Sequence, residues 1–164
     1  MHRFFALLCL ACMTSPAHAQ SLKDQVVGTW TLVSNYAERA DGTRLQTFGK
    51  DPKGIAVYDG NGRFAYIIMG DVRKKFGANN RMEGSDEENR SVVQGSISYY
   101  GTYTVNEAEK SLTWHIERAS FPNWDGTSRK ISLTIDGDRL HQVAAPIPSA
   151  GGAYVPHLEW VRAK

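Results

Sequence analysis

Three polar residues in the second half of the chain carry groups that acid–base chemistry needs. His115 and Glu117 alternate to one face of the strand expected over Leu112–Arg118, and Arg129 begins the next expected strand. If that face lines a cavity, His115 serves as a base, and Glu117 or Arg129 orients the base or the substrate. If Trp114 points inward instead, His115 and Glu117 lie on the outer surface, where such groups form ordinary salt bridges. The alternation leaves both arrangements open.

The remaining histidines predict no metal site. Outside the N-terminal leader considered below, the histidines are His115, His141 and His157, which are far apart and have no His-x-His spacing. Zinc usually takes three or four protein ligands. The sequence also has no Gly-x-Ser-x-Gly element and no phosphate-binding glycine loop. We therefore expect no metal and no cofactor.

A second set of residues suits the binding of a small molecule. Aromatic rings supply apolar area, their hydroxyl or N–H tips fix orientation, and an arginine at a rim can receive a carboxylate or phosphate. The alternative is that these side chains simply fill the interior of the fold. The candidate ligand-binding residues are Tyr58, Tyr66, Tyr103, His115, Trp124 and Arg129.

Short strands joined by tight turns must position these residues. Asp59-Gly60-Asn61-Gly62 and Asp136-Gly137-Asp138 are hairpin signals, because Asn and Gly tolerate positive φ. The pattern predicts an all-β fold, an eight-stranded antiparallel up-and-down barrel, with a two-sheet sandwich as the alternative. The expected strands are 26–34, 54–58, 63–69, 99–105, 112–118, 129–135, 139–144 and 154–162.

One helix is expected between the third and fourth of these strands. Ser85-Asp86-Glu87-Glu88 has the spacing of a capping box, in which the Ser hydroxyl and the Glu88 carboxylate each take a backbone amide. The pattern predicts a helix that begins at Asp86 and ends near Ser96.

Three residues near the chain ends predict how the barrel closes. The first and last strands of a closed barrel are neighbours, so Arg162 can lie over the Trp30 ring and reach nearby carbonyls. Trp160 shares a strand face with Arg162. We expect Trp30, Trp160 and Arg162 to seal one end of the barrel.

The N-terminal residues 1–19 are typical of a secretory signal peptide. A short apolar run precedes the cleavage sequence Ala17-His18-Ala19, which predicts cleavage after Ala19. Residues 20–164 are then one domain, located in the periplasm or secreted. The alternative is a lipoprotein anchored at Cys12, but Cys9 stands where that signal has an aliphatic residue.

Composition narrows the range of partners. Lys and Arg number 19 against 17 Asp and Glu, a balance that excludes the strong basic footprint of a nucleic-acid-binding protein. Beyond the leader, no segment is apolar enough to span a membrane. Both cysteines lie in the leader, so the mature chain has no disulfide. The expected partner is a small apolar or amphipathic molecule, and the oligomeric state is left open.

The chain resembles the bacterial lipocalin-like domain family from Val27 to Arg162. The resemblance implies a β-barrel with a possible ligand cavity, without implying a particular ligand. It is carried, in order, by Gly28-Thr29-Trp30-Thr31-Leu32-Val33-Ser34, Gly54-Ile55-Ala56-Val57-Tyr58, Asp59-Gly60-Asn61-Gly62, Tyr99-Tyr100-Gly101-Thr102-Tyr103-Thr104-Val105, His115-Ile116-Glu117, Phe121-Pro122-Asn123-Trp124-Asp125-Gly126 and Glu159-Trp160-Val161-Arg162.

Three hypotheses about function follow. The first is an exported lipocalin-like barrel that binds a small, largely apolar ligand in its interior by burying it. The second is an enzyme on the same barrel, an isomerase, cyclase or hydrolase with His115 as base. The third is a protein-interaction module that uses the loops 37–52 and 146–152. An interior cavity supports the first hypothesis, and a cavity-facing His115 the second.

Overall fold

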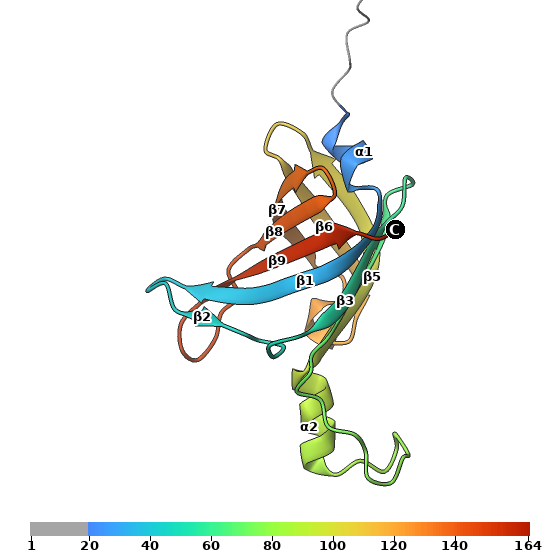
Figure 1. Cartoon of the computed structure of the whole chain (residues 1–164), viewed down its shortest axis with the longest axis vertical. Coiled ribbons are helices and arrows are strands. Elements are labelled where there is room, and N and C mark those ends of the chain that lie inside the picture. The colour runs from blue at the N-terminus through green and yellow to red at the C-terminus, as the bar shows by residue number, and fades with distance from the viewer. Residues whose placement is uncertain (1–19) are drawn as a thin grey trace, which may run out of the picture.

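The strands form one antiparallel sheet that closes on itself (Figure 1). The computed structural model describes residues 20–164. Each barrel strand pairs with the next along the chain, and the first pairs with the last over Trp30–Arg39 and Tyr154–Arg162. The closed sheet is therefore an eight-stranded antiparallel barrel. Its strands are β1 (Gly28–Arg39), β3 (Lys53–Tyr58), β4 (Arg63–Met69), β5 (Ser96–Asn106), β6 (Ser111–Ala119), β7 (Ser128–Asp136), β8 (Arg139–Ala144) and β9 (Tyr154–Arg162).

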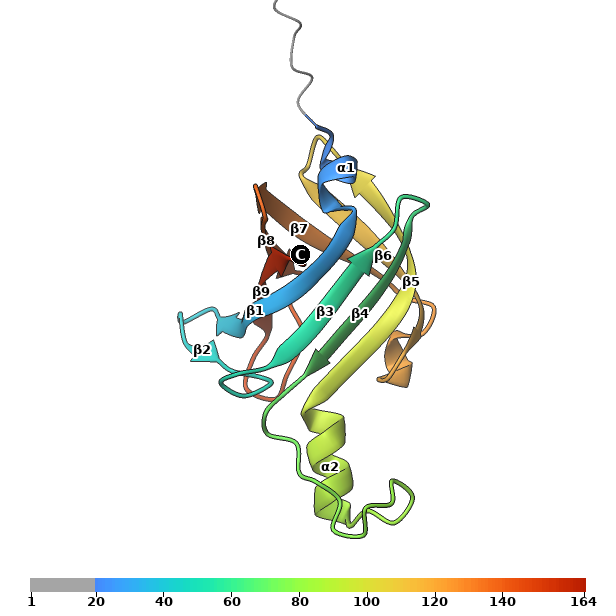
Figure 2. The same cartoon turned by 45° about the vertical axis from the view of Figure 1, so that its right-hand side comes forward.

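The β3–β4 hairpin shows how local sequence sets the strand register. The Asp59 carboxylate accepts hydrogen bonds from the backbone amides of Asn61 (2.9 Å) and Arg63 (2.7 Å). Gly62 has φ 86°, a conformation that favours glycine. This turn pairs Tyr58 with Phe64, and alternate residues of both strands are buried. The strands β3 and β4 lie side by side in Figure 2.

The order of the elements corrects one sequence-based prediction. The helix α2 (Asp86–Gln94) lies between β4 and β5, not between the third and fourth strands, and a further helix, α1 (Leu22–Val26), precedes β1. The position of α2 in the order of strands changes because an additional short strand, β2 (Arg44–Leu45), pairs with the end of β1. Alternation over two residues is too short a pattern to predict such a strand.

The start of α2 follows from its capping box. The Ser85 hydroxyl accepts from the Glu88 amide at 3.3 Å, and the Glu88 carboxylate accepts from the Ser85 amide at 2.8 Å. The helix ends before Gly95, and β5 continues directly from it. In both views α2 extends from the end of the barrel opposite α1 (Figures 1 and 2).

The end of the barrel beside α1 is closed by contacts between the two ends of the domain. Trp30 is fully buried, and its indole N–H donates to the Val26 carbonyl at 2.8 Å. The Arg162 guanidinium lies 4.2 Å from the Trp30 ring centroid. The Glu107 carboxylate accepts from two amides at the start of α1, at 2.8 and 3.0 Å. These contacts hold α1 across this end of the barrel.

Inward-facing aromatic and aliphatic side chains fill the half of the barrel next to this closed end. Trp160 is buried there, 5.2 Å from the Tyr66 ring centroid. In the same interior, Trp114 donates through its indole N–H to the Tyr58 hydroxyl at 3.1 Å, and the Gln142 amide donates to the same oxygen at 2.9 Å. The pairing is incomplete, because the Trp160 indole N–H and the Gln142 amide oxygen are buried without a hydrogen-bond partner within the described residues.

The predicted signal peptide, residues 1–19, and the alternative lipidation site at Cys12 lie outside the described residues. Within residues 20–164, neither α-helix has the length and apolarity of a helix that spans a membrane.

Candidate ligand-binding cavity

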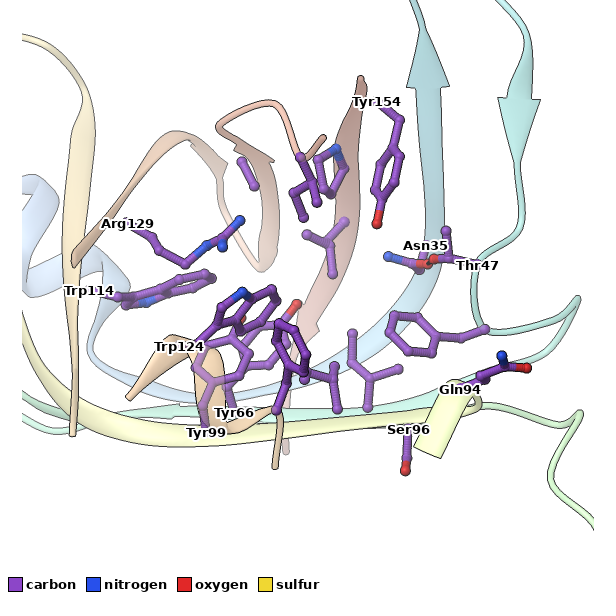
Figure 3. A pocket seen from close by; sticks show the side chains of 18 of the residues that line it. Asn35, Thr47, Tyr66, Gln94, Ser96, Tyr99, Trp114, Trp124, Arg129 and Tyr154 are labelled. Atoms are coloured by element: carbon purple, nitrogen blue, oxygen red, sulfur yellow. Dashed lines mark hydrogen bonds between the residues drawn. The ribbon is translucent and has the colours of Figure 1, made fainter. Parts of the chain in front are cut away.

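A cavity of about 410 Å³ opens at the end of the barrel away from α1 (Figure 3). Its volume falls within the range of about 300–1,000 Å³ that small-molecule sites occupy. Strands β1, β4, β5, β6, β7, β8 and β9 supply the walls, and the loops after β2, β6 and β8 supply the mouth. The described lining residues are Asn35, Thr47, Phe48, Tyr66, Ile68, Val93, Gln94, Ser96, Ile97, Tyr99, Trp114, Phe121, Trp124, Arg129, Ala144, Ile147, Pro148, Tyr154, Pro156 and Leu158.

The floor of the cavity is a cluster of aromatic rings. Tyr66 and Tyr99 face each other across β4 and β5 with ring centroids 4.6 Å apart, and Trp114 meets both rings edge-on at 5.2 and 5.4 Å. Trp124 continues the cluster toward the mouth, 5.6 Å from Tyr99. The edge-on contacts rigidify the rings, so this part of the cavity is a preformed apolar surface.

Burial keeps the two floor phenols neutral. Loss of solvent raises the pKa of Tyr66 well above its ordinary value, and the nearby Tyr99 hydroxyl raises it further. Burial likewise raises the pKa of Tyr99 well above the ordinary value. Both residues are less than a tenth exposed. Their O–H groups therefore stay protonated at physiological pH and serve as directional polar contacts in an apolar floor.

Arg129 enters the cavity from the start of β7. Ile131 and Leu133 are buried in the interior, so strand alternation turns Arg129 inward as well. Its guanidinium carbon lies 4.2 Å from the Trp124 ring centroid. Figure 3 shows the side chain extending over Trp124 toward the cavity. Arg129 is one predicted site residue that the structure brings to the cavity, together with Tyr66 and Trp124.

Asn35 supplies a polar group on the opposite wall. It is 8 % exposed, and its amide oxygen accepts a hydrogen bond from the Thr47 hydroxyl at 3.0 Å. That contact orients the amide, so its NH₂ group is turned toward the cavity beside Tyr154 (Figure 3). The β2–β3 loop thereby positions a side chain of β1.

Tyr58 and Tyr103, also predicted ligand-binding residues, do not line the cavity. Both are buried below its floor, and Tyr103 donates through its hydroxyl to the Asp59 carbonyl at 2.7 Å. Tyr58 is engaged with Trp114 and Gln142 as described above. These two residues fill the barrel interior, which is the alternative that the sequence left open.

His115 and Glu117 lie on the outer face of β6, because Trp114 is the residue that points inward. The His115 Nδ1 is 2.9 Å from the Ser128 hydroxyl, and its Nε2 is 3.4 Å from the Thr104 hydroxyl. Glu117 forms a bidentate ion pair with Arg63 at 2.6 and 3.2 Å. The placement of His115 in a cavity, on which the acid–base hypothesis depended, is therefore not found.

Asn35 is a site residue that strict alternation misses. From Trp30 and Leu32, a period of two would place Asn35 outside. The register of β1 against β9 shifts between Leu32 and Ser34, and this bulge turns Asn35 inward. A one-residue insertion in a strand carries no composition signal in this sequence.

No three His, Cys, Asp or Glu side chains within residues 20–164 gather as a metal site requires. Among the same residues, Arg129 is the one lining residue with a formal charge. The surface that a ligand would meet is apolar and aromatic, with a guanidinium on one wall and an amide on the other.

A closed eight-stranded up-and-down barrel with an apolar cavity at one end defines the class of lipocalin-type barrels. The chain belongs to the lipocalin-like domain family, whose sequence model matches residues 27–163. No curated protein matches the sequence significantly.

Two solved structures are similar to the chain in its barrel. One is a redesigned β-barrel with 13 % identity and a TM-score of 0.44, covering 88 % of this chain and 96 % of that one. The other is EF1p2_mFAP2b bound to DFHBI, with 15 % identity and a TM-score of 0.40. The similarity covers 85 % of this chain and 94 % of that one. At these values the family assignment rests on the sequence match.

Proposed function

We propose that the protein binds a small, largely apolar molecule in the open end of its barrel. The observation that carries this proposal is the 410 Å³ cavity with a preformed floor of Tyr66, Tyr99 and Trp114. Each Å² of apolar ligand surface removed from water contributes about 25 cal/mol. Rings already fixed by their neighbours lose little conformational entropy when a ligand arrives.

Binding is favoured over acid–base catalysis by where the polar groups lie. His115, the base of the enzyme hypothesis, is on the outer face of β6 and contacts Ser128. The loops proposed for protein interaction contribute Phe48 and Ile147 to the mouth of the cavity. Their apolar side chains thus contact the same space that a ligand would fill.

The proposal is tested with N-phenyl-1-naphthylamine, a neutral probe that fluoresces in apolar surroundings. Mature protein is expected to bind it with one-to-one stoichiometry. Ala144→Phe places a ring in the cavity and is expected to weaken binding by tenfold or more, because the ring and the probe compete for one volume. Native mass spectrometry of gently purified protein then searches for a retained molecule and its identity.

Val143→Phe is the matched control. Val143 neighbours Ala144 on β8 but faces outward, so the same increase in size leaves the cavity unchanged. Circular dichroism and thermal unfolding verify that both variants are folded. Equal probe affinity in wild type and folded Ala144→Phe would refute binding in this cavity.

We also propose that the protein is exported with cleavage after Ala19. The support is the apolar leader followed by Ala17-His18-Ala19. The intact mass of protein recovered from the producing cell is expected to match a chain that begins at Gln20. A chain that begins at an acylated Cys12 would overturn the proposal and place the protein on a membrane surface.

A further inference from the structure

The cavity contains a positive charge that no carboxylate neutralises. Within residues 20–164, Arg129 forms no ion pair, whereas Arg63, Arg118 and Arg162 all do. No Asp or Glu is among the described lining residues. A cation that is partly withdrawn from water in an apolar site is costly unless a counter-charge or hydrogen-bond acceptors accompany it.

The contact with Trp124 holds the guanidinium against the cavity wall without using its hydrogen-bond donors. The guanidinium carbon lies over the indole ring, 4.2 Å from the ring centroid. A guanidinium donates through its edge, in the plane of its N–H bonds. No described residue accepts from Arg129, so the edge remains available to a ligand in the cavity (Figure 3). The contact therefore holds Arg129 in place while its donors stay available to an acceptor in the cavity.

We propose that the ligand of this cavity is a monocarboxylate with an apolar body, and that Arg129 binds its carboxylate. The planar edge of one guanidinium matches the two oxygens of a carboxylate through parallel N–H···O bonds. The apolar body lies on Tyr66, Tyr99 and Trp114. This inference rests on the proposed function and names the chemical class of its ligand.

The charge count favours a carboxylate over a phosphate monoester. One guanidinium neutralises one negative charge, whereas a phosphate monoester carries about 1.5 to 2. No second Lys or Arg lies among the described lining residues to meet the excess. A phosphate would leave uncompensated charge in an apolar site.

Asn35 adds a second polar contact on the wall opposite Arg129. Its NH₂ group is turned toward the cavity while its oxygen is held by Thr47 (Figure 3). A ligand with a carbonyl, hydroxyl or ether oxygen away from its carboxylate would accept a hydrogen bond there. The structure thus favours oxygenated acids over plain hydrocarbon acids of the same length.

The experiment compares decanoate with decanol as competitors of N-phenyl-1-naphthylamine, which is neutral and reports on the cavity whatever its charge preference. Wild-type protein is expected to bind decanoate at least tenfold more tightly than decanol, since a charge-assisted hydrogen-bond pair is about twice as strong as a neutral one. Decyl phosphate is the third competitor and is expected to bind less tightly than decanoate.

Two variants with the same change in charge distinguish an effect of the cavity site from an effect of the protein's overall electrostatic field. Arg129→Gln is expected to lower decanoate affinity about tenfold and to lower the affinities for decanol and the probe by a much smaller factor. Arg139→Gln removes one charge from an exposed position of β8 and is expected to change none of them. Circular dichroism and thermal unfolding verify that both variants are folded.

The outcomes distinguish the two proposals. Equal affinities of wild type for decanoate and decanol, or equal losses of both in Arg129→Gln, would overturn the carboxylate assignment and leave the binding function standing. Tighter binding of decyl phosphate than of decanoate would overturn it in favour of a phosphate. If the probe and all three competitors fail to bind, the binding function fails, and the carboxylate assignment fails with it.

Discussion

The Arg162 guanidinium lies 4.2 Å above the centroid of the Trp30 ring, so the last residue of β9 covers the first buried residue of β1. The same guanidinium donates to the carbonyls of Val27 (2.9 Å) and Gln25 (2.7 Å). One side chain therefore ties together the C-terminal strand, the N-terminal strand and the end of α1. The closed end of the barrel depends on this contact because β1 and β9 are the strands that complete the sheet.

Replacing Arg162 should destabilise the barrel. Arg162→Ala removes two charge-assisted hydrogen bonds, a cation–π contact and the exposed ion pair with Asp138, and is expected to lower the free energy of unfolding by about 2–3 kcal/mol. Arg162→Lys keeps the charge near Trp30 but loses the second carbonyl contact, so about half of the loss is expected. Urea denaturation followed by Trp fluorescence measures both values.

The control for this series is Arg139→Ala. Arg139 is an exposed residue of the neighbouring strand β8 and forms no ion pair within residues 20–164. Its removal is expected to change stability by less than about 0.5 kcal/mol. A loss in Arg162→Ala no larger than that in Arg139→Ala would show that the contact contributes nothing to closure.

Four of the seven tyrosines should resist ionisation in the folded protein. Burial raises the pKa of Tyr58, Tyr66, Tyr99 and Tyr103 above the ordinary value of 10. Because these folded-state pKa values exceed the unfolded ones, the stability that they contribute is present below pH 10 and is lost as pH rises beyond it. Tyrosinate absorbance at alkaline pH should increase sharply when denaturant is added at the same pH. Full ionisation before unfolding would contradict the burial of these phenols.

Stability should also fall at mildly acidic pH through His157. Burial and the neighbouring His141, 3.3 Å away, lower the pKa of His157, while Arg44 lowers it and Glu38 and Glu159 oppose the shift. Since the folded pKa lies below the unfolded value of 6.5, the unfolded chain takes up the proton first. The stability that His157 contributes is therefore fully present above pH 6.5 and is lost as pH falls through its folded-state pKa.

The test of this pH dependence is urea denaturation between about pH 7.5 and about pH 5.5. One proton gives a limiting slope of about 1.4 kcal/mol per pH unit. His157→Gln is expected to flatten the profile, because Gln still stacks on Tyr36 but takes up no proton. An identical slope in the variant would assign the pH dependence to other groups.

Much of the barrel could be predicted from sequence because its determinants are local. Alternation and hairpin signals such as Asp59-Gly60-Asn61-Gly62 specify each strand and its partner, and the capping box marks the start of α2. The family match over residues 27–163 agrees with the resemblance drawn from those segments. The short strand β2 was missed because its two residues form no pattern.

The site was harder to predict because its determinants are not local. A period of two shows that His115 and Glu117 share a face but not that Trp114 takes the interior, which depends on rings from other strands such as Phe64, 5.6 Å away. The position of an inward-facing side chain along the barrel axis is also set by the register between strands. Tyr103 and Tyr66 therefore look alike in sequence, yet one is below the floor and the other forms it.

Gly101 should tolerate no side chain. A Cβ atom there would lie 2.0 Å from the carbonyl oxygen of His115 on the adjacent strand, at the point where the register of β5 and β6 shifts. Backbone of the neighbouring strand cannot move without breaking the sheet, so Gly101→Ala is expected to cost about 2–3 kcal/mol of unfolding free energy. Gly60→Ala is the matched control, because no atom lies within 4 Å of its added methyl group. It should be neutral or stabilising by up to about 1 kcal/mol, through a less flexible unfolded chain. Urea midpoints measure both variants, and equal midpoints would show that β5 and β6 do not approach closely at Gly101.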